Sequence, residues 1–196
     1  MGGQKDWTRR DRILAAAERE FTTHGFAGAR MDRIAAQADV NKQLLFHYFG
    51  SKAGLHHAAV VAALDRAQIR ASPHGQPAER LRKLVGQLQQ VTANSPALLT
   101  ILAGAHGAGI ADDSARAVDD WYARAIGSAR QILDDGQRSG HFRDDLDAAP
   151  IAELVVSVSL GTMAAARDSG RADAGKSRDR IGDTLVRLVM DYCAWR

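Results

Sequence analysis

The sequence has few of the residues that mark a secreted, membrane-spanning or disulfide-bonded protein. Its 196 residues include one cysteine, Cys193, so the chain cannot form an internal disulfide, which favours a reducing compartment. No apolar run approaches the roughly 18–20 residues needed to cross a bilayer. The charged N-terminal segment, with no apolar stretch after it, predicts that the chain is not secreted. We therefore expect a cytoplasmic protein with no membrane partner.

Catalytic and metal-binding motifs are also missing. The sequence has no HExxH motif, no paired cysteines and no nucleophile elbow. The glycine-rich GAHGAG at 104–109 has the wrong spacing for a dinucleotide loop and follows no strand. His56 and His57 are adjacent, and neighbours in a helix point to different sides, so they make a poor metal site. We expect no cofactor, no metal and no enzymatic activity.

What the sequence has in abundance is helical patterning, and no pair of β-strands is apparent. Thr8 and Asp11 resemble a capping box, apolar residues then recur at helical spacing, and Gly25 suits a left-handed stop. Further helices are expected near 31–38, 42–49, 52–70, 112–139, 148–167 and 177–194, with others starting at Pro77 and at Ser95-Pro96. The fold class is therefore all-α.

Two lobes are expected within this all-α chain. The segment ASPHGQP at 71–77 breaks the helical pattern with two of the four prolines, so we expect a boundary between lobes there. We assign residues 1–56 to the first domain and residues 57–196 to the second. Residues 1–56 hold nine Lys/Arg and six Asp/Glu, whereas the rest of the chain is balanced at 17 of each. That distribution favours a polyanionic partner for the first domain.

Residues 31–50 read as two short helices joined by a tight turn. Apolar residues hold the pair together, and the small Ala35 stands where the helices would cross. Asp39 stands at the turn, where a positive φ is often needed and Asp is tolerated. Asn41 is placed to cap the second helix. This is the pattern of a helix-turn-helix, whose second helix lies in the DNA major groove.

The second helix has one face for the core and one for DNA. Leu45 and Phe49, four residues apart, fall on the buried face. Lys42 and Gln43 stand at the N-terminal end that reaches base edges, where Lys suits guanine and Gln suits adenine. The remaining candidate contacts are Leu44 to a thymine methyl, Phe46 to a sugar or methyl, and His47, Tyr48, Lys52, Arg30 and Arg33 to phosphate.

These residues carry a resemblance to a known family. The stretch MDRIAAQADVNKQLLFHYFGSKAGL, with EFTTHGFAGAR before it, resembles the N-terminal signature of the TetR family of bacterial transcriptional regulators. The detailed match covers residues 9–56, and GQRSGHFRDDLDAAPIAELV is similar to the family's lead-in to its penultimate helix. Three residues depart from the pattern: Asp39 replaces the turn glycine, Phe46 a Tyr, and Arg30 a phosphate-contacting Thr.

The resemblance implies a dimeric, ligand-responsive repressor. An N-terminal three-helix helix-turn-helix lobe would bind a palindromic operator in double-stranded DNA, and a small-molecule inducer would release it. The C-terminal helical lobe would bind that inducer and form a homodimer through the last two helices, as a four-helix bundle. The candidate inducer-binding residues are Leu102, His106, Trp121, Tyr122 and Met163.

Alternatives from other classes remain open at this point. An activator, or a constitutive DNA-binding regulator with no inducer, fits the same patterns. An enzyme or ligand carrier built on a helical scaffold is a further alternative, and salt-insensitive activity without DNA affinity would distinguish it. The identity of the inducer, the operator sequence and the regulated genes are not encoded in these patterns.

Overall fold

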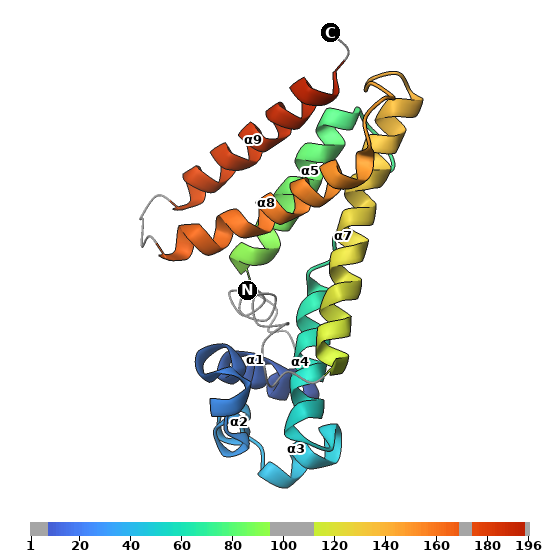
Figure 1. Ribbon diagram of the computed structural model, residues 1–196. Helices are drawn as coiled ribbons and strands as arrows, with labels where there is room; N and C mark the ends of the chain where they lie inside the picture. The colour runs from blue at the N-terminus through green and yellow to red at the C-terminus, as the bar shows by residue number, and fades with distance from the viewer. Residues whose placement is uncertain (1–7, 95–111, 169–173, 195–196) are drawn as a thin grey trace, which may run out of the picture. The chain divides into compact units, whose positions relative to one another are not determined.

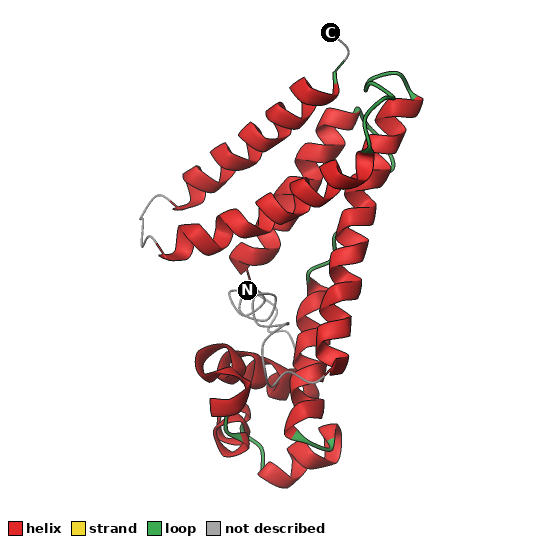
Figure 2. Ribbon diagram, viewed as in Figure 1, coloured by secondary structure: helices red, strands yellow, loops and turns green. Residues whose placement is uncertain are grey.

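The computed structural model describes residues 8–94, 112–168 and 174–194, and every regular element in these ranges is a helix, as predicted (Figure 1, Figure 2). Side chains are described throughout these ranges except at 92–94, 112, 162–168 and 174–178. The predicted helix at Ser95-Pro96 lies outside the described residues. The helices are α1 (Arg9–Gly28), α2 (Met31–Ala38), α3 (Lys42–Phe49), α4 (Lys52–Arg66), α5 (Pro77–Asn94), α7 (Asp112–Arg138), α8 (Ala148–Asp168) and α9 (Ala174–Cys193).

Local sequence signals place the helix ends. Thr8 and Asp11 form the predicted capping box, in which the Asp11 N–H donates to Thr8 Oγ1 (3.2 Å) and the Thr8 N–H donates to Asp11 Oδ2 (3.3 Å). Gly25 has φ 65° and interrupts α1, and Gly140 has φ 72° two residues beyond the end of α7. The helix predicted near 52–70 is shorter than expected and ends at Arg66 as α4.

The chain divides into two compact units. Among the described residues, unit 1 holds residues 8–67 and 112–119, and unit 2 holds residues 68–94, 120–168 and 174–194. All of α4 belongs to unit 1, whereas the predicted domain boundary after residue 56 falls inside that helix. The first turns of α7 complete unit 1 and the rest of α7 belongs to unit 2.

In unit 1, α1 packs on both α2 and α4, and α3 packs on α2 and α4. The buried face of each helix supplies large apolar side chains, which are fully or almost fully excluded from solvent: Ile13, Phe21, Ile34, Leu45 and Leu55. Full burial of one such side chain contributes about 1.5–3 kcal/mol. This shared core holds the two short helices α2 and α3 on the longer α1 and α4.

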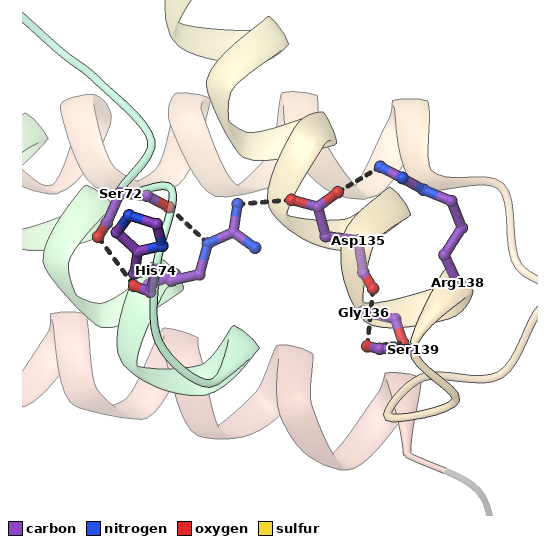
Figure 3. A network of polar contacts seen from close by, with 7 residues as sticks. Ser72, His74, Asp135, Gly136, Arg138 and Ser139 are labelled. Carbon is purple, nitrogen blue, oxygen red and sulfur yellow. Dashed lines mark hydrogen bonds and ion pairs between the residues drawn. The ribbon is translucent and has the colours of Figure 1, made fainter.

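In unit 2, α5 packs on α8 and α9, which also pack on each other (Figure 1). A partly buried ion pair joins the start of α5 to α7. Arg80 is 5% exposed; its Nη2 donates to Asp135 Oδ2 (2.7 Å) and its Nε donates to the Ser72 carbonyl oxygen (2.6 Å). Asp135 also forms an ion pair with Arg138, as Figure 3 shows, so its carboxylate pairs with two guanidinium groups. The network fixes the loop before α5 against the end of α7.

Gly136 provides a test of packing in unit 2. A Cβ at this position would lie 2.0 Å from a ring carbon of Phe142, which is 1% exposed. Gly136→Ala should therefore lower the free energy of unfolding by about 1–3 kcal/mol through overpacking. Gly127→Ala, in the same helix with nothing within 4 Å of the new Cβ, should raise it by about 0.5–1 kcal/mol. Urea unfolding compares the two, and equal stabilities would contradict this packing account.

Candidate nucleic-acid interface

The turn between α2 and α3 has the geometry of a helix-turn-helix. Asp39 adopts the left-handed conformation (φ 54°, ψ 53°), as predicted from its position at the turn. The Val40 N–H donates to the Ala35 carbonyl oxygen (3.0 Å), which closes the turn. The small Ala35 side chain is 5% exposed and belongs to the core of unit 1.

The short helix α3 is capped at its start and anchored in its middle. The Leu44 N–H donates to Asn41 Oδ1 (2.8 Å), which confirms the predicted cap. Leu45 is fully buried, and Phe49 packs against the same core while remaining partly exposed. Leu44 also packs partly against this core, so less of its side chain is available for a thymine methyl than the sequence suggests.

The other face of α3 is exposed to solvent. Phe46 is 43% exposed and Tyr48 is 46% exposed, which is unusual for large aromatic side chains on one short helix. The polar residues predicted to contact DNA share this exposure: Lys42, Gln43 and His47. The described structure therefore gathers five of the nine predicted DNA-binding residues on one solvent-facing surface of α3.

The junction between α3 and α4 is closely packed. The Gly54 N–H donates to Ser51 Oγ (3.0 Å), so Ser51 caps the start of α4. A Cβ on Gly54 would lie 2.2 Å from the Phe49 carbonyl oxygen, so the end of α3 passes directly over this glycine. Because α4 lies in the core of unit 1, this contact fixes the direction of α3.

A buried carboxylate on α1 holds the start of α2. Glu20 is 2% exposed and accepts from the Arg33 Nε (2.7 Å) and from the Arg30 N–H (3.0 Å), and the Arg33 Nη2 forms an ion pair with the same carboxylate (2.6 Å). Burial alone would raise the pKa of Glu20, but these hydrogen bonds and the charge of Arg33 outweigh burial and lower it. The Arg33 Nη2 also donates to the Gly28 carbonyl oxygen (3.0 Å). The structure thus gives Arg33 a role inside the protein, and the side chain of Arg30 remains exposed.

Lys52 also has contacts within unit 1. Its Nζ donates to the Ala27 carbonyl oxygen (3.2 Å) and lies 5.0 Å from the centre of the Phe26 ring. These contacts tie the start of α4 to the end of α1. The prediction that Lys52 binds a phosphate stays a prediction, but such a contact would compete with these two.

His56 is a buried residue whose role the sequence did not reveal. Its ring meets Phe21 and Phe26 edge-on (centroids 4.7 and 5.2 Å), and its Nδ1 lies 3.3 Å from Ser114 Oγ at the start of α7. Burial lowers the pKa of His56, and nearby His57 and Lys52 lower it further. The imidazole is therefore a packed core group joining α1, α4 and α7 within unit 1.

The predicted inducer-binding residues are only partly described. Leu102 and His106 lie outside the described residues, as does the segment at 104–109, and the side chain of Met163 is also outside them. Trp121 is 3% exposed, and its ring lies edge-on to the half-buried Tyr122 (5.6 Å), whose pKa is raised by burial. Their contact with a ligand stays a prediction.

Neither a membrane span nor a metal cluster is present among the described residues. No described helix is long and apolar enough to span a membrane. No group of three or more His, Cys, Asp or Glu in the described part of the chain is arranged to hold a metal ion.

Two family profiles match the sequence. "Bacterial regulatory proteins, tetR family" covers residues 13–59, and "Tetracyclin repressor-like, C-terminal domain" covers residues 77–170. The HTH-type transcriptional repressor SCO4008 of Streptomyces coelicolor is 32% identical over 187 residues, which is 91% of this chain and 93% of that protein. The chain belongs to the TetR family of bacterial regulators. It is a helix-turn-helix transcriptional regulator and not an enzyme, as the sequence predicts.

Other transcriptional regulators extend the comparison. The HTH-type transcriptional repressor NicS of Pseudomonas putida is 33% identical over 153 residues, covering 73% of this chain and 69% of that protein. The regulator PfmR from Thermus thermophilus has the same fold, with a TM-score of 0.75 at 23% identity over 93% of this chain and 96% of that chain. FadR from Bacillus subtilis was solved in complex with stearoyl-CoA. It has a TM-score of 0.74 at 15% identity, over 91% of this chain and 96% of that chain.

The buried Glu20 carboxylate generates a stability prediction. Glu20→Gln should lower the free energy of unfolding by about 1–3 kcal/mol, because the Arg33 guanidinium loses its charged partner. This expected loss of unfolding free energy is small for a buried pair, since the Arg33 side chain is 40% exposed. Asp65→Asn, an acid-to-amide change at an exposed site of α4, should change stability by less than about 0.5 kcal/mol.

The pH dependence of the same variant gives a second readout. The folded pKa of Glu20 lies below its ordinary value of 4.5, so the carboxylate contributes fully above pH 4.5. Below pH 4.5 the unfolded chain binds the proton first, and the contribution is lost as the pH falls through the folded pKa. The stability difference between the unchanged chain and Glu20→Gln should therefore shrink on acidification. A difference that is independent of pH would contradict an ionised Glu20.

Proposed function

We propose that this TetR-family regulator is a dimeric repressor that reads a near-palindromic operator with α3 of each copy and is released by a small molecule. The observation that carries the DNA-reading part is the exposed face of α3. Polar donors and two uncovered aromatic side chains stand together on a helix whose opposite face is anchored by Leu45. Such a surface is suited to contact the base edges and the flanking sugar-phosphate backbone of a major groove.

The contact that each side chain of α3 would make with DNA depends on its position along the helix. Gln43 stands in the first turn, at the end of the helix that approaches base edges, and a side-chain amide pairs bidentately with adenine. His47 and Tyr48 stand in the last turn, where ring N–H and hydroxyl groups are placed to donate to phosphate oxygens. Phe46 provides an apolar surface for a sugar or a thymine methyl. Two copies related by two-fold symmetry would place their α3 helices about 34–36 Å apart.

Uncovered apolar side chains on α8 and α9 support the dimer. On α9 an exposed stripe recurs every three or four residues: Ile181, Thr184, Leu188 and Tyr192. On α8, Leu154 is 55% exposed, and the small residues Ser157 and Gly161 follow it on the same face. A hollow of about 400 Å³ lies between Val158 and the α9 stripe. A second copy would cover this apolar surface in a four-helix bundle.

Named relatives support repression and small-molecule control. SCO4008 and NicS are both named as repressors, and FadR from Bacillus subtilis was solved with stearoyl-CoA. A long-chain acyl-CoA is therefore the first class of inducer to examine, by its ability to displace DNA. The usual allosteric coupling, here between binding of the inducer and binding of DNA, is about 1–3 kcal/mol, or about 5–150-fold in affinity.

The reading of bases by α3 is tested with Gln43→Ala. Duplexes selected from a random-sequence pool by the unchanged chain provide the operator. The variant should lose discrimination at one base pair of each half-site, at a cost of about 1–3 kcal/mol per contact, while other positions keep their preference. Gln37→Ala, an exposed glutamine on α2, should leave every preference unchanged. Uniform weakening across all sequences would place Gln43 on the DNA backbone instead.

The dimer surface is tested with Leu188→Glu. The Leu188 side chain is 62% exposed, so a charge there costs the folded copy little but would be buried without a partner in the bundle. Light scattering should find a dimer for the unchanged chain and a monomer for the variant at the same micromolar concentration. Gln131→Glu, at an exposed position of α7, should remain dimeric. A monomeric unchanged chain would contradict the proposal.

A further inference from the structure

Lys42, the first residue of α3, forms an ion pair with Asp32 of α2. Lys42 Nζ lies 2.9 and 3.1 Å from the two carboxylate oxygens of Asp32, in the first turn of α2. Both side chains are on the surface, with exposed fractions of 48% for Lys42 and 72% for Asp32. Their partners distinguish them from Arg33 and Lys52, which bind a buried carboxylate and a backbone carbonyl. Lys42 is therefore exposed on α3 together with a carboxylate.

The pair has chemistry that a free lysine lacks. An ammonium group has three N–H donors, and the hydrogen bond to Asp32 Oδ2 leaves at least one of them for another acceptor, even with Asp32 Oδ1 in contact as well. The pair carries no net charge, so it gains little from the high negative potential of the phosphates. Phosphate affinity comes from net positive charge and counterion release. The neutral O6 and N7 atoms of guanine, by contrast, need only a correctly placed donor.

We propose that Asp32 is a specificity-determining residue, because it turns Lys42 from a phosphate contact into a neutral reader of a base-edge acceptor. Asp32 holds the Lys42 side chain over the N-terminal end of α3 and repels phosphate oxygens that approach the ammonium. The remaining N–H donates to guanine in the major groove. This inference rests on the proposed function, since it requires α3 to enter the groove.

Salt dependence separates the two roles of Lys42. The slope of log affinity against log salt counts the phosphate charges that the protein neutralises, at about one unit for each. The double variant Asp32→Asn/Lys42→Met has the same net charge as the unchanged chain. If the pair is a neutral reader, the double variant should keep the slope of the unchanged chain. It should nevertheless lose at least about five-fold of discrimination at one guanine-containing base pair of each half-site.

The single variant Asp32→Asn should have the opposite effect on the slope. Lys42, released from its partner, should bind phosphate on any sequence and steepen the slope by about one unit for each bound copy. Affinity for an unrelated duplex should then rise more than affinity for the selected duplex. Asp145→Asn is the matched control, because it adds the same charge beside Arg143 in unit 2 and should leave the slope unchanged.

The measurement is fluorescence anisotropy of the full chain with a selected and an unrelated duplex, over a series of salt concentrations. A slope that falls by about one unit per copy in the double variant would show that Lys42 holds a phosphate, which overturns the inference. Unchanged base discrimination in that variant, or an unchanged slope in Asp32→Asn, would overturn it as well. If the unchanged chain prefers no duplex, the proposed function fails first and the inference falls with it.

Discussion

A helix of eight residues is not stable alone in water, and the DNA-reading surface depends on the contacts that hold α3 in place. Burial of Leu45 fixes the face that α3 turns inward, and the Asn41 cap fixes where the helix begins. The close approach of the Phe49 carbonyl to Gly54 fixes its end against α4. With its inward face, its start and its end all set, α3 can expose aromatic and polar side chains that contribute little to folding.

The sequence was sufficient wherever one local interaction decides the structure. The capping box at Thr8, the left-handed turn at Asp39 and the cap at Asn41 each depend on residues within a few positions, and each is present. The same holds for the buried and exposed faces of α3, because helical geometry alone separates Leu45 from Phe46. The predicted end of α4 lies about four residues beyond the observed one, since apolar periodicity continues past Arg66 while the helix does not.

The sequence was insufficient where partners lie far apart along the chain. Lysine and arginine next to a helix-turn-helix suggest phosphate contacts, but Arg33 is paired with Glu20 and Lys52 with the Ala27 carbonyl, 13 and 25 residues away. One signal was available: Glu20 falls on the apolar face of α1, three residues after Ala17, and a buried acid needs a partner. No comparable signal marks the pairing of Asp32 with Lys42, which needs the crossing of α2 and α3.

The central claim, that α3 reads a specific operator as part of a dimer, is tested most directly by the unchanged chain. Its affinity for DNA from the region upstream of its own gene should be compared by fluorescence anisotropy with its affinity for an unrelated duplex, at two salt concentrations. The account predicts selective binding of two copies per site, with the preference retained when salt weakens both complexes. Equal affinity for both duplexes at each salt concentration, or no binding to either, would contradict it.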